Sequence, residues 1–141
     1  MIRALILPFL AALMAMMPVA YAQPVDGGRA MVELITERER VEPGETFYAA
    51  IKMDLDAGWH VYWRNAGDSG EPTQITWTLP KGFSAGKIVW PPPSPIKVGP
   101  LLNYGYNDEA IHMVPIQVPK DAKPGTEVTL AAKATWLVCE D

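Results

Sequence analysis

The chain has 141 residues, of which 12 are Lys or Arg and 16 are Asp or Glu, so its formal net charge at pH 7 is −4. The acidic residues are scattered and no basic stripe is present, which argues against a nucleic-acid partner. Hydrophobic residues make up 49% of the chain, which is typical of a globular protein with its own core.

The N-terminal segment has the features of a secretory signal peptide. A short start that contains Arg3 precedes an apolar run over residues 4–17, and Ala20-Tyr21-Ala22 is the small-x-small pattern that a signal peptidase cleaves. The apolar run is shorter than the roughly 20 residues that span a bilayer. We therefore predict a cleaved signal peptide over residues 1–22 and one exported domain over residues 23–141.

Most of the exported part has the two-residue period of β-strands. Over residues 46–55, five apolar positions alternate with more polar ones, which predicts a strand with one buried face. Residues 127–138 alternate in the same way. Four further stretches are strand candidates: "VELITER", "WHVYWR", "QITWTL" and "IHMVPIQV". Pro115 interrupts the last of these, so we expect an edge strand or a bulge there.

The segments between these strands carry the residues of turns and loops. "EPGE" (42–45) and "KPGT" (123–126) place Pro before Gly, as in a type II turn. "NAGDSGEP" (65–72) and "LPKGFSAG" (79–86) have the composition of loops. No segment shows a sustained helical period. Seven or eight short strands in one domain predict an antiparallel β-sandwich that is immunoglobulin-like in architecture, without the core cysteine pair of antibody domains.

One long stretch resists the strand interpretation. "WPPPSPIKVGPLLNYGYND" (90–108) is rich in proline, which cannot donate a hydrogen bond to a sheet. We expect a long surface excursion here, and loops of this length in compact domains are often functional. The alternative, a polyproline ligand for SH3-like modules, suits an exported protein poorly.

The single cysteine, Cys139, is the third residue from the end of the chain. Exported proteins usually pair their cysteines, so a single one suggests an intermolecular bond, a reactive thiol or a missing partner. If the last strand keeps its alternation, Trp136 and Val138 face the core and Cys139 faces outward. The thiol is therefore expected at or near the surface.

Two binding functions are alternatives to thiol chemistry. The soft side chains that copper(I) prefers are present, but no two of them have a close ligand spacing, and His60 is expected on a strand surface. They are Cys139, His60, His112, Met31, Met53 and Met113. The aromatic residues could form a saccharide-binding face, although most aromatic side chains in a small sandwich belong to the core. We predict no metal site and no cofactor.

Three sequence blocks resemble the N-terminal periplasmic domain of the DsbD-type thiol:disulfide interchange proteins. They are "GWHVYWRNAGDSGEPTQITWTLPKGF" (58–83), "WPPPSPIKVGPLLNYGYNDEAIHMVPI" (90–116) and "AKATWLVCED" (132–141), in the order that the family has. The resemblance is strongest to the branch called suppressor of copper sensitivity protein B. It covers nearly all of the exported part, and the one clear departure is Ala66, where the family usually has proline.

The resemblance implies an immunoglobulin-like domain with a redox-active cysteine pair. Cys139 corresponds to the first cysteine of the family's pair, and the resemblance implies that it is the nucleophile. The segment around Tyr104, Gly105 and Tyr106 corresponds to a cap loop over the active site. No second cysteine follows in this chain, so the resemblance implies a piece of a longer protein, truncated at the C-terminal end of the domain.

The resemblance also implies partners and a location. The domain would take electrons from a transmembrane domain of the same full-length protein and pass them to thioredoxin-like periplasmic proteins. That protein would be anchored in the inner membrane, with this domain in the periplasm, acting as part of a protein-disulfide reductase in copper tolerance or cytochrome c assembly. The alternative is a periplasmic module that binds copper or a saccharide without redox chemistry.

Overall fold

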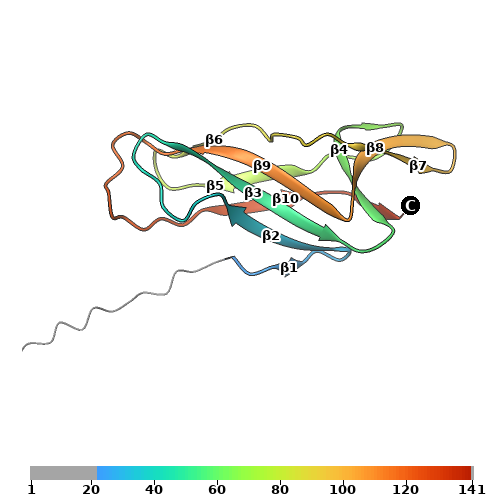
Figure 1. The fold of residues 1–141 in the computed structure, drawn as a ribbon, viewed down its shortest axis with the longest axis horizontal. Coiled ribbons are helices and arrows are strands. Elements are labelled where there is room, and N and C mark those ends of the chain that lie inside the picture. The colour runs from blue at the N-terminus through green and yellow to red at the C-terminus, as the bar shows by residue number, and fades with distance from the viewer. Residues whose placement is uncertain (1–21, 141) are drawn as a thin grey trace, which may run out of the picture.

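The described part of the protein, residues 22–140 of a computed structural model, consists of strands and loops (Figure 1). The predicted signal peptide lies outside these residues except for Ala22. No helix of the described part is long and apolar enough to cross a membrane. The strands are β1 Val25–Asp26, β2 Ala30–Thr36, β3 Thr46–Leu55, β4 Trp59–Gly67, β5 Gln74–Thr78, β6 Ser84–Ala85, β7 Ser94–Val98, β8 Leu101–Asn107, β9 Glu109–Gln117, β10 Ala131–Thr135 and β11 Val138–Glu140.

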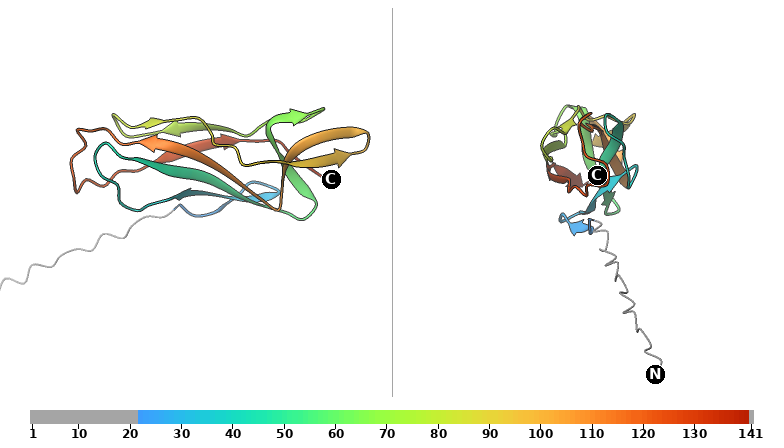
Figure 2. Two further views of the ribbon diagram at one scale, coloured as in Figure 1. Left: turned by 45° about the horizontal axis from the view of Figure 1, so that its top comes forward. Right: turned by 90° about the vertical axis from the view of Figure 1, so that its left-hand side faces the viewer.

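The strands form two layers of an elongated sandwich (Figure 2). One layer is a sheet in the order β1-β2-β3-β9-β6, and the other contains the sheets β11-β4-β8-β7 and β10-β5. Every ladder between these strands is antiparallel. The all-β class and the predicted immunoglobulin-like antiparallel sandwich are confirmed, although the strands are shorter and more numerous than expected.

The period-two pattern of residues 46–55 predicts β3 correctly. The strand has the predicted bounds, and its inward side chains Phe47, Ala49, Ile51 and Met53 are buried. They belong to two apolar clusters, one around Met53, Val61 and Tyr106 and the other around Phe47, Val114 and Ile116. Burial of these side chains removes apolar surface from water, which is the main favourable term in folding.

β9 is an interior strand between β3 and β6, so the edge-strand alternative for Pro115 was wrong. The bulge alternative agrees with the register, because Ala85 pairs with Ile116 and Val89 with Met113, which leaves residues 86–88 opposite residues 114–115. The Pro115 carbonyl accepts a hydrogen bond of 2.8 Å from the Gly86 amide. The backbone N and C=O of one strand residue point to the same side. The Pro115 nitrogen, which has no N–H, therefore faces β6, and the ladder between β9 and β3 loses no hydrogen bond. On this side, β6 pairs with Ile116 and Gln117, and Val89 pairs with Met113 on the other side of the proline.

The C-terminal strand is shorter than predicted and interrupted. Residues 127–130 are not part of a strand, and Val128 is exposed. β10 and β11 are separated by Trp136 and Leu137, yet Trp136 and Val138 pack against the core as the alternation predicts.

The proline-rich stretch was wrongly predicted to be an irregular excursion, because most of it forms the β7–β8 hairpin. β7 is the edge strand of its sheet, where Pro95 is tolerated because its outer side needs no partner. Gly99 and Pro100 form the connection between the two strands. The hairpin lies at the end of the sandwich at which the chain ends (Figure 1).

Candidate functional site

Cys139 lies on β11, the three-residue strand at the edge of its sheet. It is paired across the ladder with His60 on β4, while the neighbouring Val138 is paired with Val61. Val61 and Val138 face the apolar core. Cys139 and His60 therefore share the opposite face of the sheet, and the free thiol is half-buried. The prediction of an outward-facing cysteine near the surface agrees with this position.

Tyr62 provides the polar environment of the thiol. Its side chain is only 2% exposed, and it shares the face of β4 that carries His60. Burial, together with a side-chain hydrogen bond to Cys139, raises the pKa of Tyr62 to about 12, while a hydrogen bond with Ser69 acts in the opposite direction. The phenol therefore stays protonated near neutral pH and can donate a hydrogen bond to the sulfur.

A loop that interrupts a strand covers Tyr62. Residue 61 pairs with residue 138, and residue 74 pairs with residue 135. Between these two pairs the chain advances by thirteen residues from β4 to β5 but by only three residues from β10 to β11. The extra residues form an excursion, which we define as residues 63–73; it consists of the last part of β4, where the register with β8 shifts between Tyr62 and Gly67, and of the loop that follows. The excursion closes on itself through a parallel bridge between Tyr62 and Pro72.

Two glycines allow the excursion to lie close to the sheet. Gly70 has a φ of 98°, and a Cβ there would lie 2.3 Å from a Tyr62 ring carbon. Gly67 has a φ of 90°, and a Cβ there would lie 2.4 Å from the Leu102 carbonyl oxygen. Real Cβ atoms do not approach that closely, so both positions need glycine. The backbone of the excursion thus lies directly against the Tyr62 ring.

The two histidines occupy buried positions, contrary to the surface position expected for His60. His60 is 0% exposed and meets the Tyr62 ring edge-on, with 5.0 Å between ring centroids. His112 lies on β9 opposite Ile51, edge-on to the rings of Trp90 and Tyr106. Burial lowers the pKa of His112 to about 4, so this imidazole is neutral at pH 7.

The residues expected in a cap loop lie on β8. Tyr106 is 8% exposed, belongs to the core around Val61, and donates a hydrogen bond of 2.8 Å from its hydroxyl to the Pro91 carbonyl oxygen. Gly105 is buried between Tyr62 and Ser94 in the sheet, and Tyr104 is half-buried. The Tyr106 ring therefore lies on the core side of the sheet, opposite Cys139. A covering role for residues 104–106 stays a prediction.

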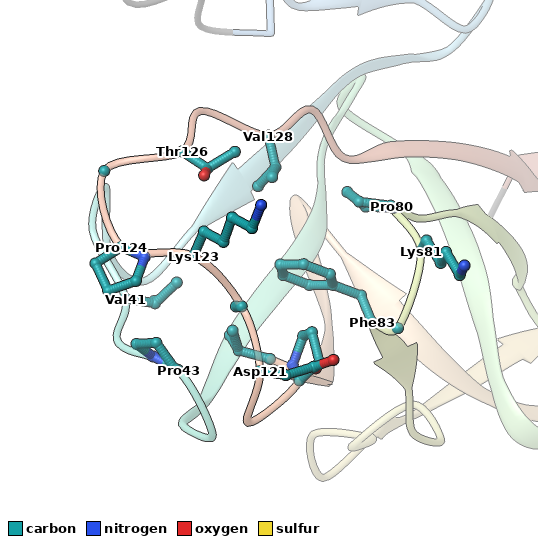
Figure 3. Close-up of a pocket in the computed structure, with 15 residues that line it drawn as sticks. Val41, Pro43, Pro80, Lys81, Phe83, Asp121, Lys123, Pro124, Thr126 and Val128 are labelled. Carbon is teal, nitrogen blue, oxygen red and sulfur yellow. The ribbon is translucent and has the colours of Figure 1, made fainter.

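A separate groove of about 470 Å³ lies between loops at the other end of the sandwich (Figure 3). Apolar side chains and prolines form most of its wall, and Phe83 extends into it, whereas Lys81 points away. The groove shares no lining residue with the surroundings of Cys139. Among residues 22–140, no group of three or more His, Cys, Asp or Glu side chains could hold a metal ion.

Tyr62, Ser69 and Asn103 are site residues that the sequence did not single out. Asn103 joins the site through bonds to Ser69, which lies 34 positions earlier in the sequence. The available signal was "GDSG" at residues 67–70, in which two glycines flank Asp-Ser beside a strand that continues afterwards. Paired glycines at a strand interruption indicate a close backbone approach.

Comparison with known proteins gives a family and a related fold. The family model described as "Thiol:disulfide interchange protein DsbD, N-terminal" matches residues 32–141. The crystal structure of the N-terminal periplasmic domain of ScsB from Proteus mirabilis matches with a TM-score of 0.58 and 23% sequence identity. That match covers 80% of this chain and 41% of the ScsB domain, so the chain spans less than half of the solved structure. No curated protein sequence matches the chain.

Proposed function

The chain belongs to the family of the N-terminal domain of thiol:disulfide interchange protein DsbD, and from that membership we propose that Cys139 is its exchanging thiol. The observation that carries the proposal is the position of Cys139. The half-buried free thiol lies on an edge strand, with the protonated Tyr62 hydroxyl as its hydrogen-bond partner.

The proposed step is nucleophilic exchange with a protein disulfide. The Cys139 thiolate attacks one sulfur of the partner disulfide, the Cys139–partner S–S bond forms, and the partner's own S–S bond breaks. The departing partner sulfur leaves as a thiolate and takes a proton from solvent. Cys139 is thereby oxidised to a mixed disulfide and one partner sulfur is reduced. A second thiol must then attack this mixed disulfide to complete the transfer of two electrons.

Tyr62 supports this step through its hydroxyl. A hydrogen bond to a sulfur that carries negative charge is stronger than one to a neutral S–H group. The Tyr62 donor is fixed in place before the reaction, so its stabilisation of the anionic sulfur requires no rearrangement during the attack. The edge position of β11 leaves one side of the strand open for a partner to approach.

The location and the electron route are part of the same proposal. The related ScsB domain is described as periplasmic, and the N-terminal segment of this chain has the pattern of an export signal. We place the domain in the periplasm. Its electron donor would be a membrane-embedded part of the same protein, and its acceptors would be thioredoxin-like proteins. Thioredoxin-like acceptors suit the step because they present an accessible Cys-x-x-Cys disulfide.

A copper(I) module is the alternative use of the same residues. Pairing of Cys139 with His60 places a thiol and an imidazole, both ligands that copper(I) accepts, on adjacent strands. The described residues offer no third side chain of a metal-binding cluster beside them. We therefore expect weak copper(I) binding, measured by competition with a copper(I) chelator. Tight one-to-one binding that disappears in both Cys139→Ser and His60→Ala would favour the alternative.

The exchange proposal is tested by trapping the mixed disulfide. The reduced chain is mixed with a thioredoxin-like protein whose Cys-x-x-Cys is oxidised, and the products are separated without reductant. We expect a one-to-one covalent adduct that dithiothreitol releases, and no adduct with Cys139→Ser. Absence of an adduct from the folded wild-type chain would refute the proposal.

A further inference from the structure

The excursion at residues 63–73 is attached to the sheet through one buried side chain. The Oδ1 atom of Asn103 accepts two hydrogen bonds from Ser69, one from the backbone amide at 2.9 Å and one from the hydroxyl at 3.1 Å. Asn103 is 0% exposed and lies on β8, next to Gly67 in the ladder. Its side chain thus connects the middle of the excursion to a strand that lies 34 residues later in sequence.

The backbone on either side of Ser69 follows the same strand. The Asp68 amide donates to the Leu102 carbonyl at 3.1 Å, and the Leu102 amide donates to Asp68 Oδ2 at 2.8 Å. The bond to Asp68 Oδ2 is solvent-exposed. The bonds to Asn103 are the part-buried ones, and they lie one residue before the glycine that contacts the Tyr62 ring.

Ser69 also connects Asn103 to the thiol. Ser69 uses its hydroxyl proton and its amide proton on Asn103, so the next residue, Gly70, makes the link to Tyr62 by lying against the Tyr62 ring. The Tyr62 hydroxyl keeps its own proton for the Cys139 sulfur, and the contacts therefore run from Asn103 through Ser69 and Gly70 to the ring that carries this hydroxyl. The Asn103 Nδ2 atom and the Thr73 hydroxyl are buried without a hydrogen-bond partner. Unpaired buried polar atoms cost free energy, so packing of the excursion alone does not explain an asparagine at this position.

We propose that Asn103 is a positioning residue that, through Ser69, holds the Tyr62 hydroxyl on the Cys139 sulfur. The excursion is then more than a cover, because it fixes a donor that stabilises negative charge on the thiol. The inference deepens the proposed function, since it concerns how that thiol is made ready for exchange. It assigns the control of the thiol to residues 63–73 and Asn103, rather than to the segment around Tyr104 and Tyr106.

The test is a double-mutant cycle on the rate at which iodoacetamide alkylates Cys139 at pH 7, followed by intact mass. Tyr62→Phe keeps the ring and removes the donor. We expect it to slow alkylation roughly three- to tenfold. A charge-assisted hydrogen bond raises the fraction of Cys139 that is thiolate, and it lowers the nucleophilicity of each thiolate by about half of that gain on a logarithmic scale, so its loss leaves a net slowing. Asn103→Leu removes the amide from the wild-type site, and we expect a slowing of similar size.

The decisive measurement is Asn103→Leu in the Tyr62→Phe background, where we expect no further slowing. Equal slowing in both backgrounds, or no effect in either, would show that Asn103 does not act through Tyr62. Faster alkylation in both backgrounds would show that the excursion is only a cover. Melting temperatures identify the folded variants, and Ser69→Ala repeats the cycle with a milder change if Asn103→Leu does not fold.

This readout is independent of the exchange proposal. Alkylation needs no partner disulfide, so the positioning role of Asn103 can fail while adduct formation with a thioredoxin-like protein succeeds. If the cycle instead shows that Asn103 acts through Tyr62 but no adduct forms with a thioredoxin-like protein, the thiol is positioned but does not exchange, and only the exchange proposal fails. Non-additivity in the cycle also separates positioning from a general loss of stability, because an unrelated structural effect would be the same with Phe or Tyr at position 62.

Discussion

Replacement of Gly70 by alanine tests whether the excursion presses on the Tyr62 ring. The new Cβ would lie 2.3 to 2.5 Å from three atoms of that ring. A positive φ costs a non-glycine residue about 1–2 kcal/mol, and overpacking in a buried site adds about 1–3 kcal/mol. We therefore expect Gly70→Ala to lower the free energy of unfolding by about 2–5 kcal/mol, which corresponds to a fall in melting temperature of roughly 8–20 °C for a domain of this size.

Gly28→Ala is the matched control for the backbone cost. Gly28 has a φ of 99°, against 98° for Gly70, and a Cβ at Gly28 would meet nothing within 4 Å. Urea unfolding of both variants separates the two contributions, since only Gly70→Ala adds a steric clash. We expect Gly70→Ala to be less stable than Gly28→Ala by about 1–3 kcal/mol. Equal stability of the two variants would refute the close contact between the excursion and Tyr62.

Two further variants test the core. The pKa of His112 is about 4 in the folded protein and near 6.5 in the unfolded chain. As the pH falls, the unfolded chain is protonated first, so the free energy of unfolding decreases between pH 6.5 and pH 4, by about 3 kcal/mol in total. His112→Leu should remove this part of the pH dependence, and urea unfolding at pH 7 and pH 4.5 measures it; an unchanged dependence would contradict the buried neutral imidazole. Tyr106→Phe should cost about 1 kcal/mol through loss of the bond to the Pro91 carbonyl while leaving the alkylation rate of Cys139 unchanged, and a change in that rate would instead support a covering role for Tyr106.

The parts of the fold that follow from local alternation could be predicted from the sequence. β3 has both the bounds and the buried face that its period of two indicates, because one face of a strand must be apolar to pack on the other layer. The orientation of Trp136, Val138 and Cys139 follows from the same rule across an interruption of the strand. Residues 127–130 show its limit, since their alternation has no partner strand beside it.

The proline-rich hairpin shows a second limit. The prolines argue against strands between residues 90 and 108, but Pro95 lies in an edge strand, where its missing donor has no consequence. Whether a strand is an edge or an interior strand is decided by the whole sheet, so a local pattern cannot reveal it. Pro115 shows the opposite case, an interior strand whose neighbouring segment pairs on both sides of the proline, with one extra residue between the pairs.

The surroundings of the thiol depend on contacts that local patterns do not contain. His60 alternates like a surface residue and is nevertheless fully buried, on the face where the excursion covers Tyr62. The bonds between Ser69 and Asn103 join two strands through a loop that sequence composition marks only as a turn-rich segment. The cysteine itself could be identified from sequence because it is the only one in the chain.

The most direct test of exchange at Cys139 is the stoichiometry of its reaction with an oxidised thioredoxin-like protein. Intact mass gives the fraction of chain in the adduct, and a chromogenic thiol reagent counts the partner thiols released. The chain holds one cysteine, so within it no second thiol can resolve the mixed disulfide. The account predicts one adduct and one new partner thiol per chain, with no further turnover. The account would be contradicted if the folded chain formed no adduct, or if this chain alone reduced several partner molecules in turn.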